Sequence, residues 1–129
     1  NRFLFISPSF DQGPDSNLRW RKFLGAGHRT LNDQLRQTGA GGRMVMTVGV
    51  AALPAQEIGA ILLAVANFDA FDGNNDPYDT HDCALLHVGD RQLFFKIDYY
   101  NRALVNLSPD ASDPAVTIRV MTVMLPEEY

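Results

Sequence analysis

The sequence has little cysteine and no long apolar segment. Its 129 residues contain one cysteine, Cys83, so no disulfide can form within the chain, which is typical of a reducing compartment. The longest uncharged apolar segment, residues 58–68, has about half the length that a membrane-spanning helix needs. No basic region precedes an apolar segment in the manner of a signal peptide. We therefore expect a cytoplasmic protein that does not cross a membrane.

Positive charge is also scarce over most of the chain. Residues 44–129 hold four basic and twelve acidic residues, whereas residues 1–43 hold seven basic and three acidic ones, and the net charge is −4. Nucleic-acid binding needs clustered positive charge to contact phosphates, so the acidic body argues against it. The basic cluster Arg19-Trp20-Arg21-Lys22 is small and typical of a solvated helix face. We expect no direct binding of nucleic acid.

Size and composition predict a single folded domain over residues 1–129. Hydrophobic residues make up 46% and charged residues 20% of the chain, which is the balance of a globular protein. The length is that of one ordinary domain. Residues 1–14, interrupted by Pro8 and Pro14, are predicted to form an extended N-terminal arm with an edge strand over residues 3–6. Residues 15–129 then form the body.

Capping residues and apolar spacing predict two or three helices. The first covers residues 15–24 and is ended by Gly25 and Gly27. The second begins at residue 28 or 30 and ends at residue 38, before a glycine-rich turn. The strongest pattern is an apolar stripe at helical spacing, which predicts a helix over residues 54–68 that lies on a sheet.

Four segments have the composition of strands, namely residues 44–50, 82–88, 91–99 and 116–125. The second and third are joined by Gly89-Asp90, which is typical of a hairpin turn. The last segment has a helix as its alternative, because Asp113 and Pro114 are good residues for a helix start. These elements predict an α+β fold, with two or three helices packed on one face of a roughly four-stranded antiparallel sheet.

The hairpin places a candidate catalytic group on its outer face. Counting outward from the turn pairs His81 with Asp98 and Cys83 with Lys96. A histidine oriented by a carboxylate beside a thiol is the minimum arrangement for nucleophilic catalysis, and Lys96 would stabilise developing negative charge. The alternative interpretation is a polar cross-strand ladder on a half-exposed sheet, because successive residues on one strand face lie about 7 Å apart.

The loop before the hairpin is rich in oxygen ligands, yet it does not match a known cation site. Asp72, Asn74 and Asp76 occupy the first three ligand positions of a calcium-binding loop. Pro77 then stands where the turn needs glycine, and Cys83 stands where the bidentate glutamate belongs. The histidines are too few to predict a zinc site. We expect no metal and no cofactor, and we interpret the loop as a set of Asx turns.

Five segments carry a family resemblance, and they are LNDQLRQT, GGRMVMTVGVAAL, NNDPYDTHD, FFKIDYYN and SPDASDPAVTIRVMTVMLPEEY. Together they resemble a bacterial family of small proteins known as domain of unknown function 3768, over about residues 29–129. The family has no established activity, so the resemblance implies no role for any residue. It implies a setting among the accessory cargo of bacterial plasmids and phages, which often includes small acidic inhibitors of host defence machinery.

The composition and the resemblance lead to one expectation and one alternative. We expect a small acidic accessory protein of a bacterial mobile element that binds another protein and inhibits a host defence complex of the restriction or CRISPR type. Its carboxylates would stand in for phosphates on a basic partner, and the candidates are Asp69, Asp72, Asp76, Asp79, Asp110 and Asp113. The alternative is a small hydrolase or transferase that uses His81 and Asp98.

Overall fold

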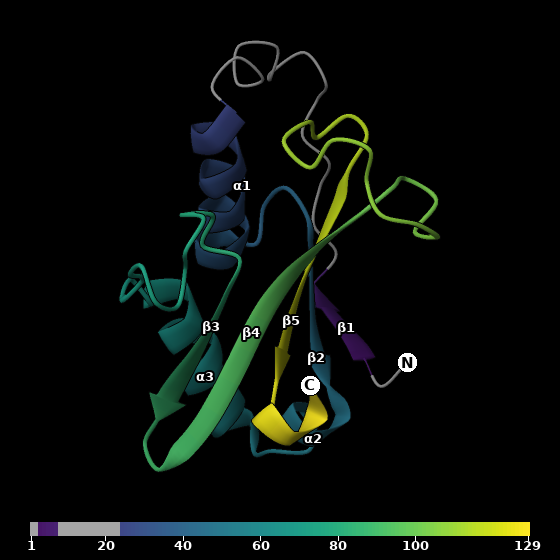
Figure 1. The fold of residues 1–129 in the computed structure, drawn as a ribbon. Helices are drawn as coiled ribbons and strands as arrows, with labels where there is room; N and C mark the ends of the chain where they lie inside the picture. Colours follow the sequence, from purple (N-terminus) through teal and green to yellow (C-terminus); the bar gives the residue numbers. More distant parts are fainter. Residues whose placement is uncertain (1–2, 8–23) are drawn as a thin grey trace.

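A computed structural model describes residues 3–7 and 24–129 (Figure 1). The helices are α1 (Leu24–Thr38), the single turn α2 (Val48–Ala51), α3 (Ala55–Asn67) and a C-terminal 3₁₀ turn (Pro126–Glu128). The strands are β1 (Phe3–Ser7), β2 (Arg43–Thr47), β3 (Cys83–Val88), β4 (Arg91–Tyr100) and β5 (Ile118–Met124). The expected helix over residues 15–24 falls almost wholly outside the described residues, as does most of the predicted arm.

The strands form one sheet in the order β1-β2-β5-β4-β3, as Figure 1 shows. Neighbouring strands are antiparallel except for β2 and β5, which are parallel. The α+β prediction is therefore confirmed, and the sheet is mixed instead of wholly antiparallel. Residues 3–7 form an edge strand, as predicted, and residues 118–124 form a strand and not a helix.

The hairpin of β3 and β4 has the predicted register. Cys83 lies opposite Lys96 and Val88 lies opposite Arg91, on either side of the Gly89-Asp90 turn. Gly89 has a φ of 61°, the positive value that a two-residue hairpin turn requires at its first central position. Turn chemistry and alternation were therefore sufficient to pair these two strands.

Two elements differ from the sequence prediction because of distant contacts. Helix α1 starts at Leu24 and continues through Gly25 and Gly27, where a break was predicted. Gly27 is buried, so packing offsets its weak helix propensity. Strand β2 ends at Thr47, and α2 follows in place of the predicted strand over residues 48–50. The Glu128 carboxylate accepts hydrogen bonds from the Thr47 hydroxyl and the Gly49 N–H, which holds the chain in this turn.

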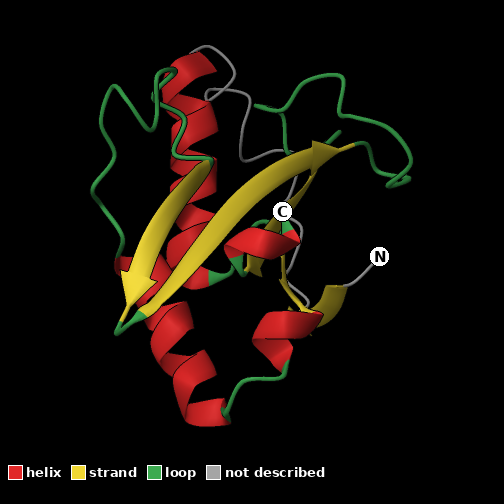
Figure 2. Cartoon of the chain, turned by 60° about the horizontal axis from the view of Figure 1, so that its bottom comes forward, coloured by secondary structure: helices red, strands yellow, loops and turns green. Residues whose placement is uncertain are grey.

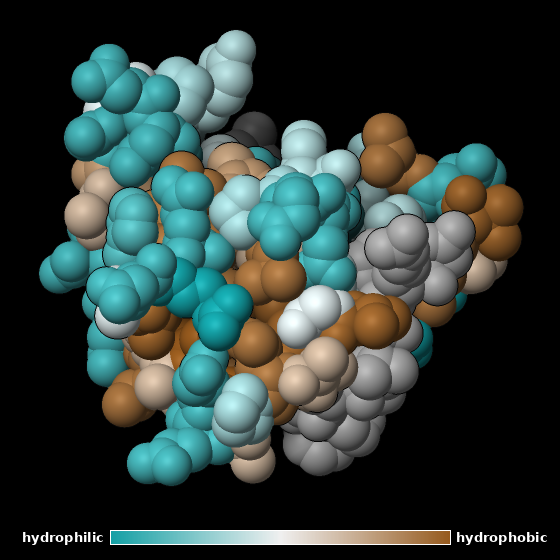
Figure 3. All heavy atoms as spheres, turned by 90° about the horizontal axis from the view of Figure 1, so that it is seen from below, coloured by the Kyte–Doolittle hydropathy of each residue, from teal (hydrophilic) through white to brown (hydrophobic). Residues whose placement is uncertain are grey.

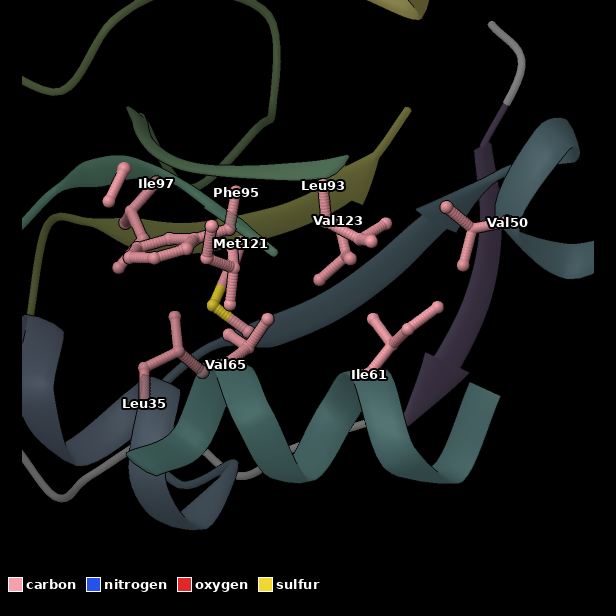
Figure 4. Close-up of a cluster of buried hydrophobic side chains, with 11 residues drawn as sticks. Leu35, Val50, Ile61, Val65, Leu93, Phe95, Ile97, Met121 and Val123 are labelled. Atoms are coloured by element: carbon pink, nitrogen blue, oxygen red, sulfur yellow. The ribbon is translucent and has the colours of Figure 1, made fainter. Parts of the chain in front are cut away.

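The core lies between the sheet and the helices, which cover one of its faces (Figures 2 and 4). Leu35 of α1 and Ile61 and Val65 of α3 are buried against the sheet. The sheet side chains that meet them are those of Leu93, Phe95, Ile97, Met121 and Val123. The apolar stripe of residues 58–68 therefore has the role that its periodicity predicted.

Gly42 offers a test of close packing between the turn after α1 and β5. A Cβ atom at this position would lie 2.6 Å from the carbonyl oxygen of Arg119 and 2.9 Å from a methyl carbon of Leu35. We expect Gly42→Ala to lower the free energy of unfolding by about 1–3 kcal/mol. Gly59 of α3 has open space around its Cα, so Gly59→Ala should raise it by about 0.5–1 kcal/mol. Urea unfolding of both variants measures the two free energies of unfolding. Equal changes in the two variants would contradict the expected close packing at Gly42.

Candidate functional site

His81 does not continue the outer face of the hairpin. Its φ is +58°, so it leaves the alternation of β3 just before that strand begins. Its ring stacks on Phe71, with 4.0 Å between ring centroids and 7° between ring planes. Its Nδ1 atom lies 2.8 Å from Oδ1 of Asp33 on α1. The imidazole is therefore oriented by a carboxylate of α1, 48 residues away in sequence.

The predicted pairing of His81 with Asp98 does not occur among the described residues. The Asp98 carboxylate instead forms an ion pair with Lys96, at 2.9 Å. The positive φ of His81 is the physical reason, because it ends the alternation on which the cross-strand pairing was based. His81 and Asp98 therefore have different partners. His81 contacts Asp33, and Asp98 forms an ion pair with Lys96.

Cys83 lies opposite Lys96 as predicted, but its environment does not favour a thiolate. Burial is the main reason that the pKa of the Cys83 thiol is raised, and the negative charges of Asp82 and Asp76 raise it further. The thiol therefore stays protonated at neutral pH. The described structure thus gives no support for Cys83 as an activated nucleophile.

Asp33 is held in place by a clamp between α1 and α3. Arg36 donates from Nη2 to Asp33 at 2.8 Å. Its Nη1 donates to three carbonyl oxygens at the C-terminal end of α3, those of Val65, Ala66 and Phe68, at 3.1, 3.1 and 2.7 Å. A guanidinium at this position satisfies carbonyls that the helix leaves open and interacts favourably with the helix dipole. Asp33 consequently bridges the clamp and His81.

Two further carboxylates face the other nitrogen of His81. Nε2 lies 3.6 Å from Oδ2 of Asp76 and 3.5 Å from Oδ1 of Asp79. Asp76 has a buried side chain, and its Oδ1 accepts hydrogen bonds from the N–H groups of Thr80 and His81, at 3.0 and 3.2 Å. Asp79 is exposed, and its Oδ2 forms an ion pair with Arg29 of α1. Asp76, Asp79 and His81 each present a ligand atom within 4.8 Å of the others.

A buried polar network supports this site from behind. Asn32 donates to the Tyr99 hydroxyl at 2.8 Å and to the Thr80 carbonyl at 3.0 Å, and it accepts from Nε of Arg119 at 2.9 Å. Burial raises the pKa of Tyr99 to about 12 and lowers the pKa of Arg119 to about 10. The network joins α1, β4 and β5 to Thr80, which lies between Asp79 and His81.

Sequence reasoning did not select Asn32, Asp33, Arg36 or Arg119, although all four position the site. The signal available for α1 was that Asn32 and Arg36 are four residues apart and next to the apolar residues Leu31 and Leu35. Polar residues in that place lie at the edge of the buried stripe, where they must find polar partners. The partners themselves could not be read from local sequence.

The six aspartates expected on a binding surface are not equivalent. Asp76 and Asp113 are buried, so they cannot belong to an exposed acidic surface, and that part of the prediction is corrected. Asp72 accepts hydrogen bonds from the N–H groups of Asn74 and Asn75, and Asp110 accepts one from Ser112. These are Asx turns, which confirms the interpretation of the loop around Asp72. The exposed members of the set are Asp69, Asp72, Asp79 and Asp110.

A separate groove of about 750 Å³ opens at the hairpin end of the molecule, in the region seen in Figure 3. Its lining includes the apolar residues Ile61, Val88 and Leu125 and the charged pair Glu57 and Arg91. Neither His81 nor Cys83 lines it. The candidate catalytic group of the hairpin therefore does not lie in this groove.

The fold and the site define a small α+β protein in which a carboxylate-oriented histidine lies where α1 meets the loop before β3. None of the described helices is long and apolar enough to span a membrane. Residues 46–128 match a family described as protein of unknown function (DUF3768), and the chain belongs to that family. No curated protein and no solved structure matches the chain.

Proposed function

We propose that this chain is an acidic accessory protein that binds another protein through the loops at one end of its sheet. The start of β3 and the end of β4 lie at the same end because these strands are antiparallel. The loop over residues 69–82 precedes β3, and the loop over residues 101–117 follows β4. These two loops carry Asp69, Asp72, Asp79 and Asp110, the four exposed members of the predicted aspartate set.

The observation that carries the proposal is a set of exposed aliphatic side chains on the second loop. Leu104, Val105 and Leu107 are 42%, 73% and 76% exposed. Clustered exposed apolar side chains beside polar residues are typical of protein interaction sites. Leu104 has a φ of +60°, which an aliphatic residue rarely adopts.

The same loop is ordered by its own hydrogen bonds. The Asn101 side chain accepts from the N–H groups of Val105 and Asn106, at 3.1 and 3.3 Å. The Leu104 N–H donates to the Asn101 carbonyl at 2.9 Å. A loop that is already ordered loses less conformational entropy when a partner binds, so its apolar contacts contribute more to affinity.

The partner's chemistry follows from the charge of the surrounding residues. Residues 44–129 have twelve acidic and four basic residues, so a basic surface is the complement. We propose that the partner is a nucleic-acid-processing defence complex of the restriction or CRISPR type, bound in the bacterial cytoplasm, and that the chain belongs to a mobile element. The acidic composition and the family's setting support this part of the proposal.

The experiment uses a triple variant of the loop and a double control variant as baits in a host lysate. Leu104→Ser, Val105→Ser and Leu107→Ser together should abolish capture of the partner. Val48→Ser with Leu63→Ser removes exposed apolar side chains from α2 and α3 and should leave capture intact. The captured protein should be basic and should elute at high salt. Capture that survives the loop variant, or that both variants abolish, would refute the proposed surface.

A functional readout tests the defence assignment separately. Expression of the chain should raise phage plating on a host with an active restriction or CRISPR system, and the loop variant should not. Equal plating with and without the chain would reject inhibition of defence while leaving the binding result in place.

A second candidate is the hydrolase or transferase, which one observation favours. The contact of 2.8 Å between His81 and Asp33 supplies an oriented imidazole, with Asp33 in the role first given to Asp98. Activity in a panel of ester and phosphoester substrates would then be lost in His81→Ala and retained in Asp98→Asn. The reverse pattern would exclude this site.

A further inference from the structure

We propose that His81, Asp76 and Asp79 form a zinc-binding site, with Asp33 positioning the histidine. The three side chains come from the segment just before β3, and Asp33 comes from α1. The site shares Asp79 with the proposed partner surface. Zinc binding is measured without a partner, so the two proposals can fail separately.

The two distances from His81 to the carboxylates fit tetrahedral coordination. Zinc binds imidazole nitrogen and carboxylate oxygen at about 2.0–2.1 Å, so two tetrahedral ligands are separated by about 3.4 Å. The separations from Nε2 of His81 are 3.6 Å to Asp76 and 3.5 Å to Asp79. Octahedral magnesium would place adjacent ligands about 2.9 Å apart, and calcium selects oxygen over imidazole. The donor set and the spacing therefore favour Zn²⁺ over both.

The oxygen atoms that face His81 are distinct from those engaged most directly elsewhere. Asp79 uses Oδ2 for its ion pair with Arg29 and presents Oδ1 to His81. Asp76 accepts its shortest hydrogen bond, from Thr80, at Oδ1 and presents Oδ2 to His81. Oδ2 of Asp76 also accepts the His81 backbone N–H at 3.2 Å, and a carboxylate oxygen has a second lone pair left for an ion. The existing contacts therefore orient both carboxylates toward the His81 ring.

Asp33 completes the arrangement from the opposite side of the ring. When the Nδ1–H of neutral His81 donates a hydrogen bond to Asp33, the lone pair lies on Nε2, the atom that faces Asp76 and Asp79. A metal-bound histidine usually donates its other N–H to such a carboxylate. Stacking on Phe71 fixes the ring plane, and the clamp of Arg36 fixes Asp33.

The charge around the site favours a cation. The carboxylates that contact His81 are Asp33, Asp76 and Asp79, and the guanidinium groups of Arg36 and Arg29 pair with Asp33 and Asp79. Three carboxylates against two guanidinium groups leave a net negative charge around the site.

Three protein ligands leave one tetrahedral position for water, as in an open zinc site. The test is a competition for Zn²⁺ between the untagged protein and a chromophoric chelator at pH 7.5. We expect binding of one ion per chain, and a spectrum of the Co²⁺-loaded protein with the intense visible bands of tetrahedral coordination. Absence of binding, or an octahedral Co²⁺ spectrum, would overturn the proposal.

Matched variants locate the ion. Asp79→Asn should weaken binding by at least about 100-fold, and Asp33→Asn by about 10–100-fold, as loss of a carboxylate behind a ligand does. His87→Ala and Asp72→Asn remove an exposed histidine and an exposed aspartate outside the site and should change nothing. Asp79 is exposed, so its variant should keep its circular dichroism and remain informative even if His81→Ala fails to fold. Unchanged affinity in Asp79→Asn, or a loss in His87→Ala, would refute the assignment.

Discussion

Replacing Arg36 with alanine should lower the free energy of unfolding by about 3–5 kcal/mol, because the change removes a buried guanidinium from the half-buried carboxylate of Asp33 and from carbonyl oxygens at the end of α3. The Arg36 side chain is 2% exposed. Its removal leaves Asp33 without the guanidinium that neutralises it, and it leaves three carbonyl oxygens of α3 without their donor. Equilibrium unfolding in urea, followed by circular dichroism, gives the value.

Two controls separate the Arg36 geometry from charge alone. Arg36→Lys should recover only part of the stability, because an ammonium group cannot reproduce the planar fork of a guanidinium. Arg91→Ala breaks the exposed pair with Glu57 and should cost less than about 1 kcal/mol. A loss for Arg36→Ala no larger than that of Arg91→Ala would show that the clamp between α1 and α3 is not important for stability.

Phe95→Ala should be comparably destabilising, by about 3–5 kcal/mol, because it opens a cavity in the middle of the core. Phe95 is fully buried on β4, and its ring packs edge-on against Phe68 and Phe71, at centroid distances of 6.0 and 6.3 Å. Since Phe71 also stacks on His81, the cavity should loosen the site as well as the core.

The measurement for Phe95 combines urea unfolding with the zinc titration. Leu63→Ala, on the exposed side of α3, should stay within about 0.5 kcal/mol of the unchanged chain. If Phe95→Ala destabilises the chain as expected while zinc affinity stays the same, then Phe71 holds His81 without help from Phe95. A loss of stability below about 1 kcal/mol would contradict the central position of Phe95 in the core.

The fold was largely predictable where short-range patterns decide structure. The apolar stripe identified α3 to within about a residue at each end, and the Gly89-Asp90 turn with its flanking alternation identified the register of β3 and β4. The parallel pairing of β2 with β5 was not predictable in the same way. These strands are far apart in the chain, and nothing in the composition of either strand specifies its neighbour.

The candidate site was predictable in residue type but not in partnership. The enzyme alternative paired His81 with Asp98, whereas the structure places Asp33 beside His81 and pairs Asp98 with Lys96. The count failed because the positive φ of His81 ends the strand pattern. Histidine and aspartate adopt a positive φ more often than most residues, but this weak preference does not show which residue of the loop will do so. Burial of Asp76 and Asp113 was not predictable either. Local sequence shows that a residue is polar, but it does not show which backbone N–H groups will donate to its carboxylate.

What the sequence by itself determined about this protein is its class, its acidic balance, the helix and hairpin that build the core, and its family. Periodicity and turn chemistry act over a few residues, so they can be recognised in the sequence alone. Only the tertiary structure decided the order of the strands, the continuation of α1 through two glycines, and the meeting of Asp33 with His81. Those features depend on contacts between residues distant in sequence, where packing and the satisfaction of buried polar groups override local preference.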